Sequence, residues 1–237
     1  MSSPSFDAVL FDCDGVLVDS ERITHVVLSQ MLGELGWAIS VEDTMRHFVG
    51  KAVKDEAALI EANTGFAITD DWLVRFRARR NAALEKDLVE IRGASDAVRA
   101  VQRVFGERMA VASGADRVKV EMQLKKIGVF DCFAGRIFSG HEMPRSKPHP
   151  DVYLAAAAGV GVEPARCVVV EDTVTGALAG LAAGATVFGY SPDEPGQQLA
   201  HSSAAALRDA GAAHVFTDMA ELPALLAQWR AADARRA

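Results

Sequence analysis

The feature that most restricts the fold of this chain is an alternation of two kinds of segment along most of its 237 residues. Short segments dense in branched apolar residues have the length of buried β-strands, and they cover residues 7–12, 108–113, 135–140, 166–172, 185–190 and 213–218. Amphipathic segments typical of helices separate or follow them, over residues 94–105, 115–127, 150–158, 174–183 and 221–231. Strands that are apolar on both faces and alternate with helices indicate a parallel sheet covered on both sides. We therefore predict an α/β fold with a Rossmann-like parallel core.

Residues 20–87 interrupt this alternation. Their apolar residues recur at helical spacing, and Gly36 and Gly65 stand where helices would end. No convincing strand pattern occurs in this stretch, so we expect a helical insert that covers the carboxyl edge of the sheet. The predicted domains are an α/β core of residues 1–19 and 88–237 and a helical cap of residues 20–87.

Polar side chains follow several of the predicted core strands at the point where each strand ends. They belong to four separate segments of the chain: Asp12, Asp14, Ser113, Gly114, Lys147, Glu171 and Asp172. Because the carboxyl ends of parallel strands meet at one edge of a sheet, we expect these groups to converge on a single site.

The charges of this predicted site require a cation. Two like charges about 4 Å apart repel each other by roughly 4 kcal/mol at an effective dielectric constant near 20, and the site gathers four carboxylates around Lys147. One lysine does not offset that repulsion, whereas a hard divalent ion with oxygen ligands does. Mg²⁺ suits a site made of a few carboxylates, water and a substrate phosphate. The ion would also attract an anionic substrate to a chain whose net charge is −7.

Four segments, "FDCDGVLVDS", "VASGA", "SKPHPDVY" and "VVVEDT", together resemble the four ordered motifs of the haloacid dehalogenase (HAD) superfamily. The similarity is greatest to its β-phosphoglucomutase-like phosphatase branch, in which a helical cap is inserted after the first strand. The resemblance implies a HAD-like core and a phosphoric monoester hydrolase that uses Mg²⁺. It also implies a small phosphorylated metabolite as the substrate, with sugar or polyol phosphates expected first.

The resemblance further implies a catalytic role for several residues. Asp12 would be the nucleophile that forms an aspartyl-phosphate intermediate. Asp14 would protonate the leaving oxygen and then activate water. Ser113, Gly114 and Lys147 would bind the phosphoryl group that is transferred.

The same resemblance implies a set of metal ligands. Asp12, Asp172 and the backbone carbonyl of Asp14 would bind Mg²⁺. Glu171 would either bind the ion as well or orient the groups around it, and the sequence leaves both roles open.

Two other functions stay open at this stage. A β-phosphoglucomutase would carry a cap histidine and a cap arginine where this chain has Thr24 and Val53, which favours a phosphatase over a mutase. Lys51 and Lys54 flank the second of these positions and are candidates for substrate contact. A catalytically inactive protein that binds phosphorylated metabolites is the third possibility. We expect surface positions for three histidines: His25, His47 and His149.

Composition excludes several classes of partner and location. The net charge of −7 without a compensating basic stripe argues against nucleic acid, and no apolar run of about 18 residues predicts a membrane span. The N-terminus lacks the features of a secretory signal. The cysteines, Cys13, Cys132 and Cys167, are odd in number and widely spaced, which suits a reducing compartment. We expect a cytoplasmic protein and, by default, a monomer.

Overall fold

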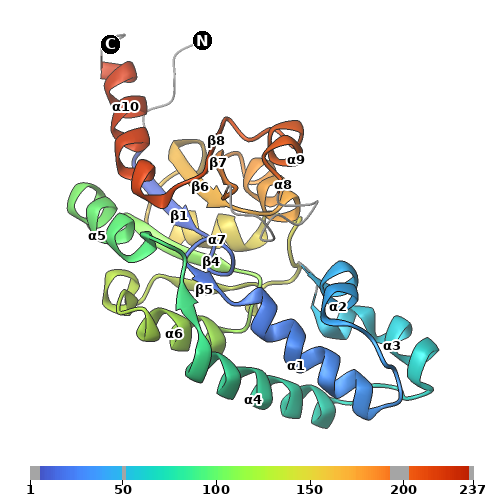
Figure 1. Cartoon of the computed structure of the whole chain (residues 1–237). Helices are drawn as coiled ribbons and strands as arrows, with labels where there is room; N and C mark the ends of the chain where they lie inside the picture. Colours follow the sequence, from blue (N-terminus) through green and yellow to red (C-terminus); the bar gives the residue numbers. More distant parts are fainter. Residues whose placement is uncertain (1–5, 50–51, 193–202, 235–237) are drawn as a thin grey trace. The chain divides into compact units, whose positions relative to one another are not determined.

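The structure is a computed structural model of the chain. It describes three ranges of residues: 6–49, 52–192 and 203–234. The chain divides into two compact units, a large one made of Met1–Val18 with Glu90–Ala237 and a small one made of Asp19–Val89. Figure 1 labels the elements of both units.

The large unit is built on a parallel sheet. Within the described residues it has six strands: β1 (Ala8–Phe11), β4 (Met109–Ser113), β5 (Ile137–Ser139), β6 (Cys167–Glu171), β7 (Thr186–Tyr190) and β8 (His214–Phe216). Their order is β5-β4-β1-β6-β7-β8, and every neighbouring pair is parallel. Each strand lies inside a segment predicted from the sequence, which confirms the α/β class.

The position of β1 explains where a site can form. From β1 the chain adds β4 and β5 on one side and then β6, β7 and β8 on the other, so the order of the strands reverses beside β1. Ligands of open α/β sheets bind at such a reversal, beyond the carboxyl ends of the strands.

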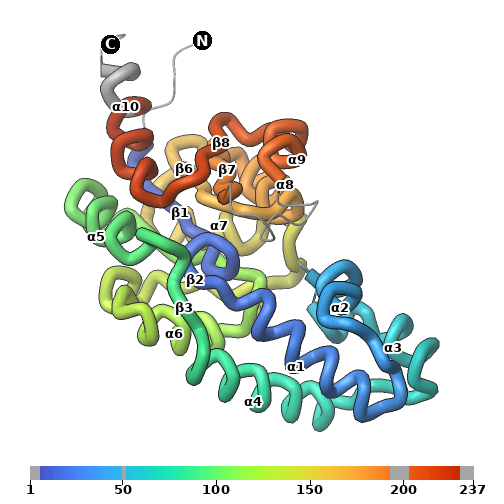
Figure 2. The backbone as a smooth tube through the Cα atoms, viewed as in Figure 1, coloured from blue at the N-terminus to red at the C-terminus, as the bar shows by residue number. Residues whose placement is uncertain are grey.

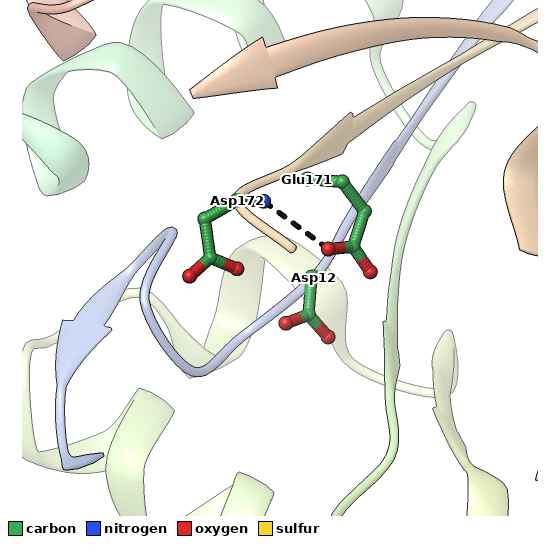
Figure 3. Close-up of side chains that lie close together, drawn as sticks. All are labelled: Asp12, Glu171 and Asp172. Carbon is green, nitrogen blue, oxygen red and sulfur yellow. Dashed lines mark hydrogen bonds between the residues drawn. The ribbon is translucent and has the colours of Figure 1, made fainter. Parts of the chain in front are cut away.

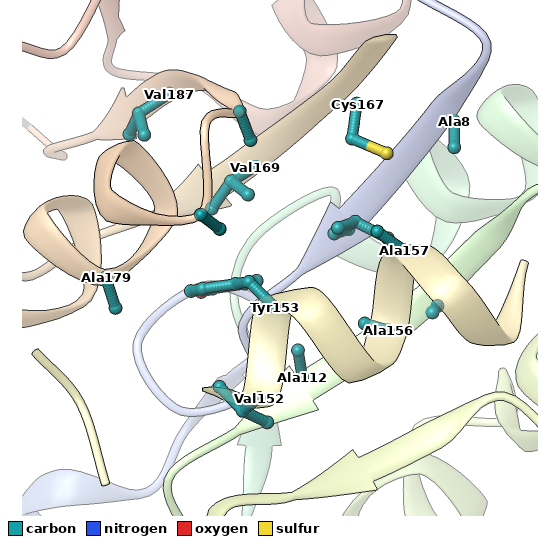
Figure 4. Close-up of a cluster of buried hydrophobic side chains, with 14 of the residues drawn as sticks. Ala8, Ala112, Val152, Tyr153, Ala156, Ala157, Cys167, Val169, Ala179 and Val187 are labelled. Atoms are coloured by element: carbon teal, nitrogen blue, oxygen red, sulfur yellow. The ribbon is translucent and has the colours of Figure 1, made fainter. Parts of the chain in front are cut away.

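Helices cover both faces of the sheet (Figure 1). On one face, α7 (Asp151–Gly159) and α8 (Val174–Ala182) pack against alternate strand residues such as Leu10 and Val169 (Figure 4). On the other face, α5 (Ala94–Phe105) and α10 (Leu222–Ala234) lie over the sheet. The ring of Trp229 on α10 stacks on that of Phe6, with 5.8 Å between the centroids. Burial on both faces is the reason that the strands are mostly apolar.

The remaining elements of the large unit are short or lie at its edges. They are α6 (Arg117–Lys126), α9 (Ala204–Asp209) and 3₁₀ turns at Phe130–Phe133, Gly140–Glu142, Pro164–Arg166 and Met219–Glu221. Helix α9 was not predicted, because six residues offer too little periodicity to recognise. A second sheet pairs β2 (Val18–Asp19) with β3 (Val89–Glu90), where the chain enters and leaves the small unit (Figure 2).

The small unit is helical. It contains α1 (Glu21–Glu34), α2 (Val41–Phe48), a 3₁₀ turn (Val53–Glu56), α3 (Ala57–Thr64) and α4 (Asp70–Asp87). Side chains at helical spacing form its core, among them Leu28, Phe48, Ile60 and Trp72. Gly65, with φ of 67°, ends α3 as the sequence predicted.

One expectation about this unit is wrong. His25 was expected at the surface, but it is buried on α1 with only 3% of its surface exposed. Its Nε2 lies 3.1 Å from the carboxylate of Glu21, one helical turn earlier. His47 and His149 are exposed as expected. Among the described helices, none combines the length and the hydropathy needed to cross a membrane.

Candidate active site

Three acidic residues meet beyond the carboxyl ends of two neighbouring strands. Asp12 directly follows β1, Glu171 ends β6, and Asp172 comes next. Each of the three offers one carboxylate oxygen that lies within 4.8 Å of the others (Figure 3). The register of the sheet, which aligns Phe11 with Val170, brings these chain segments together. These three acids of the expected site therefore lie together.

Lys147 places a positive charge between two of these carboxylates. Its Nζ donates to Asp12 Oδ1 at 2.8 Å and to Glu171 Oε1 at 2.6 Å. It also contacts the carbonyl oxygen of Ala112 at 3.1 Å and the hydroxyl of Tyr153 at 3.0 Å. Burial alone would lower the pKa of Lys147, but Asp12 and Glu171 outweigh it and hold that pKa well above its usual range. The lysine therefore remains a cation.

The environment of Asp12 favours its protonated form when no metal ion is near. Burial raises the pKa of this carboxyl from 3.8 to about 7, against the attraction of Lys147 and with a further contribution from Glu171 and Asp14. A bound cation would favour the ionised form. Binding of a metal ion at Asp12 would therefore be coupled to ionisation of its carboxyl group.

Glu171 is occupied by hydrogen bonds from the protein. Among the described residues, two donors contact Oε1: Lys147 Nζ and the Tyr153 hydroxyl. Three donors contact Oε2: the N–H of Asp172, and the N–H and Oγ1 of Thr173. An ionised carboxylate has about four lone-pair sites. Although Glu171 lies close enough to share an ion with Asp12 and Asp172, these contacts use its accepting capacity. Of the two roles that the sequence left open, the geometry favours orientation.

The carboxylate of Asp14 lies apart from this acidic group and contacts α6. Its Oδ1 is 2.7 Å from Lys119 Nζ and accepts a hydrogen bond of 2.9 Å from Gln123 Nε2. The sequence analysis did not identify Lys119, Gln123 or Tyr153. Tyr153 lies within the quoted "SKPHPDVY" segment, and Lys119 and Gln123 are spaced one helical turn apart, but neither observation alone predicts contact with a site.

The remaining predicted residues differ in position. Ser113 ends β4 and is buried, and its Oγ accepts a hydrogen bond of 3.0 Å from the Ala115 N–H. Gly114 follows it and is exposed. Lys54 is exposed in the small unit. Lys51 lies outside the described residues.

Comparison with known proteins agrees with this geometry. Residues 6–184 match the family described as haloacid dehalogenase-like hydrolase. The chain belongs to this family. The resemblance that the four motifs indicated is thereby confirmed.

Several relatives of this hydrolase have been named or solved. A protein named 6-phosphogluconate phosphatase from Escherichia coli (strain K12) is 28% identical over 226 residues, which cover 95% of each chain. Hexitol phosphatase B from the same organism is 31% identical over 186 residues, covering 77% of this chain and 83% of the relative. A HAD family hydrolase from Deinococcus radiodurans R1, solved with bound phosphate and sodium, is 39% identical with a TM-score of 0.73; the alignment covers 96% of this chain and 97% of that one.

The residues of this hydrolase fit a hard divalent cation. Asp12 and Asp172 supply carboxylate oxygens, the donor type that Mg²⁺ prefers. Glu171 is held beside Asp12 and Asp172 by three hydrogen bonds to Oε2 and by its contact with Lys147. These contacts keep Glu171 in place whether or not it binds the ion. Asp12 and Asp172 as ligands, with Glu171 orienting them, would match the needs of a magnesium site.

The packing of Glu171 makes Gly176 sensitive to substitution. A Cβ atom at this position of α8 would lie 1.7 Å from Glu171 Oε1. Because Glu171 is held by hydrogen bonds, it cannot move aside without breaking them. Gly176→Ala is therefore expected to reduce the free energy of unfolding by about 3 kcal/mol, which lowers Tm by roughly 6–12 °C in a thermal unfolding experiment.

Gly33 on α1 provides the matched control for this prediction. It is also a helical glycine, but no heavy atom of the described residues lies within 4 Å of the position of its Cβ. Gly33→Ala is expected to leave Tm unchanged or raise it, because alanine favours helix by about 1 kcal/mol over glycine. An equal Tm for Gly176→Ala and the wild type would contradict the packing described for Glu171.

Proposed function

We propose that this hydrolase is a Mg²⁺-dependent phosphatase that acts through an aspartyl-phosphate on Asp12. The observation that carries the proposal is that one carboxylate, Asp12, lies both in contact with Lys147 and within reach of an ion shared with Asp172. A phosphoryl group that approaches Asp12 would have positive charge on more than one side. Bound Mg²⁺ would supply part of that charge and would keep Asp12 ionised.

The chain's own residues divide the reaction into two steps. In the first, an oxygen of Asp12 bonds to phosphorus while the ester bond to the alcohol breaks, and Asp14 gives its proton to the departing alcohol oxygen. In the second, Asp14 takes a proton from water, whose oxygen bonds to phosphorus as the bond to Asp12 breaks. Lys147 stabilises the charge on the phosphoryl oxygens in both steps, with Ser113 and Gly114 as further binding groups.

The names of the relatives suggest a class of substrate. Two of them are named for phosphorylated derivatives of sugars, 6-phosphogluconate and hexitol phosphates. We therefore propose a sugar or polyol phosphate as the substrate. The small helical unit is proposed to act as the cap that selects it, with Lys51 and Lys54 as candidate contacts. The monomeric state and cytoplasmic location remain predictions.

A substrate screen tests this function. The purified protein is incubated with phosphorylated sugars, sugar acids, polyols, glycolate and nucleotides, with Mg²⁺ or with a chelator, and released phosphate is measured. We expect release that depends on Mg²⁺ and is fastest for a sugar or polyol phosphate. Conversion of a β-hexose 1-phosphate into the 6-phosphate, measured by a coupled assay, would support the mutase alternative. Binding without turnover of any compound would support the inactive binding protein.

The pKa of Asp12 predicts how Mg²⁺ binding depends on pH. Because that pKa is raised to about 7, the folded protein holds this proton more tightly than the unfolded chain does. The contribution of Asp12 to stability therefore falls as pH rises from 3.8 to about 7. Its ionised fraction grows from about one tenth at pH 6 to about nine tenths at pH 8, and only this form binds the ion.

Thermal unfolding over a series of Mg²⁺ concentrations measures this coupling. The Mg²⁺ concentration that gives a given rise in Tm is expected to be about tenfold lower at pH 8 than at pH 6. Asp12→Asn should remove this difference, because asparagine does not ionise. If the same Mg²⁺ concentration gives that rise at both pH values in the wild type, the result would argue against Asp12 as a ligand that must lose its proton.

A further inference from the structure

A buried lysine on α6 contacts a residue that the sequence assigned to catalysis. Lys119 has only 5% of its surface exposed, and its Nζ lies 2.7 Å from Asp14 Oδ1. Burial of a lysine is costly unless the charge is paired. Asp14 Oδ1 supplies a partner for the ammonium group, so Lys119 and Asp14 hold each other beside the site.

Gln123 strengthens the same contact from one helical turn further along α6. Its side chain is fully buried, and Nε2 donates to Asp14 Oδ1 at 2.9 Å. The other end of the amide, Oε1, accepts from the thiol of Cys13 at 3.4 Å. A thiol is a hydrogen-bond donor, and an amide oxygen can only accept. The donor at Cys13 fixes the amide so that its NH₂ group faces Asp14.

We propose that Lys119, with Gln123, is a positioning residue that holds the carboxyl group of Asp14 for proton transfer to the leaving oxygen. The inference rests on the proposed function, since it assumes that Asp14 is the proton donor. Lys119 is not a catalytic residue in this account, because it acts through Asp14.

The chemistry of a carboxyl group explains why two donors on one oxygen suit this task. When a carboxyl carries a proton on Oδ2, its Oδ1 is a carbonyl oxygen and still accepts hydrogen bonds. Lys119 and Gln123 therefore hold Oδ1 of Asp14 before and after a proton leaves the other oxygen. The orientation of the group is thus maintained through the step in which the alcohol departs, and misplacement by about 1 Å can slow an enzymatic step about 10²-fold.

The dependence of the rate on the leaving group tests the proposal. An alkyl phosphate needs a proton on its departing oxygen, whereas 4-nitrophenyl phosphate releases a stable anion and needs little help. Lys119→Met is expected to lower kcat/KM about 30-fold for an alkyl phosphate such as a polyol phosphate. For 4-nitrophenyl phosphate the expected loss is less than about threefold, because kcat/KM reports only the steps up to departure of the alcohol or phenol.

Matched variants separate positioning from a general structural effect. Lys125→Met removes an exposed lysine from the same helix and should leave both substrates unaffected. Gln123→Met should show the same selective loss, about tenfold for the alkyl ester, and it provides the comparison if Lys119→Met does not fold. Lys119→Arg keeps a charged donor and should recover part of the selective loss.

The outcomes distinguish this inference from the proposed function. If the wild type hydrolyses neither ester in the presence of Mg²⁺, the proposed function fails. If the wild type hydrolyses both and a folded Lys119→Met loses the same factor on both, the positioning role is overturned and the proposed function stands. A loss confined to the alkyl ester supports the role of Lys119.

Discussion

Replacing Asp12 with asparagine is expected to lower kcat for phosphate release by about 10⁴-fold or more. The substitution keeps the size of the side chain but removes the carboxylate that forms the bond to phosphorus. It also removes one of the oxygen ligands that Asp12 and Asp172 are proposed to offer to Mg²⁺. Release of phosphate from 4-nitrophenyl phosphate, measured with saturating Mg²⁺, is the most direct readout.

The loss in Asp12→Asn should come from chemistry and not from unfolding. Burial disfavours the charge of Asp12 in the folded protein, and Lys147 retains Glu171 as a partner at 2.6 Å. We therefore expect a Tm equal to or above that of the wild type when Mg²⁺ is absent. Asp96→Asn is the control, because the side chain of Asp96 is 96% exposed and pairs only loosely with Arg99 at 3.8 Å. Turnover by Asp12→Asn at the rate of this control would eliminate the proposed nucleophile.

Gly15→Ala is expected to reduce kcat/KM by about 10²-fold, the cost of misplacing a group of the site by about 1 Å. Gly15 has φ of 78°, and a Cβ atom there would lie 2.1 Å from Asp172 Oδ2. The new methyl group would displace Asp172 from the position in which it can share an ion with Asp12. The concentration of Mg²⁺ needed for half-maximal activity should therefore rise together with the loss of rate.

A second glycine of the large unit controls for backbone strain in this experiment. Gly135 has φ of 76°, and no heavy atom of the described residues lies within 4 Å of the position of its Cβ. Gly135→Ala thus carries the same left-handed backbone cost, about 1–2 kcal/mol, without a clash at the site. We expect it to lower Tm and to leave the Mg²⁺ requirement unchanged. If the two variants have the same Mg²⁺ requirement, the close approach of Gly15 to Asp172 does not matter for the ion.

Much of the fold followed from hydrophobic patterning because the sheet is parallel and buried. β1, β4 and β6 are buried along their whole length, so each appears in the sequence as an apolar run, which in β4 and β6 ends on a polar residue of the site. The position of the candidate site could be predicted from the sequence for a related reason. Once the strands are parallel, Asp12 after β1 and Asp172 after β6 must reach the same edge, whatever the details of packing.

The division of roles among the acids could not be predicted in the same way. Sequence spacing placed Glu171 beside Asp172 but left open whether it binds an ion. It accepts side-chain hydrogen bonds from Lys147, Tyr153 and Thr173, and two of these residues are more than 15 positions away in the chain. Only the folded arrangement determines which donors surround a carboxylate.

Helix α6 shows most clearly what the sequence predicts and what only the tertiary structure determines. Its sequence predicted a helix over residues 115–127, and in the structure Val120 and Leu124, one turn apart, are both fully buried. Hydrophobicity alone would place Val118 inside and Lys119 outside, yet Val118 is 69% exposed and Lys119 is 5% exposed. The reason is the neighbouring segment: Asp14 lies opposite Lys119 at 2.7 Å, and a paired charge can be buried there. Local periodicity determines which elements form, but the group that faces each side chain across the interior is a property of the tertiary structure.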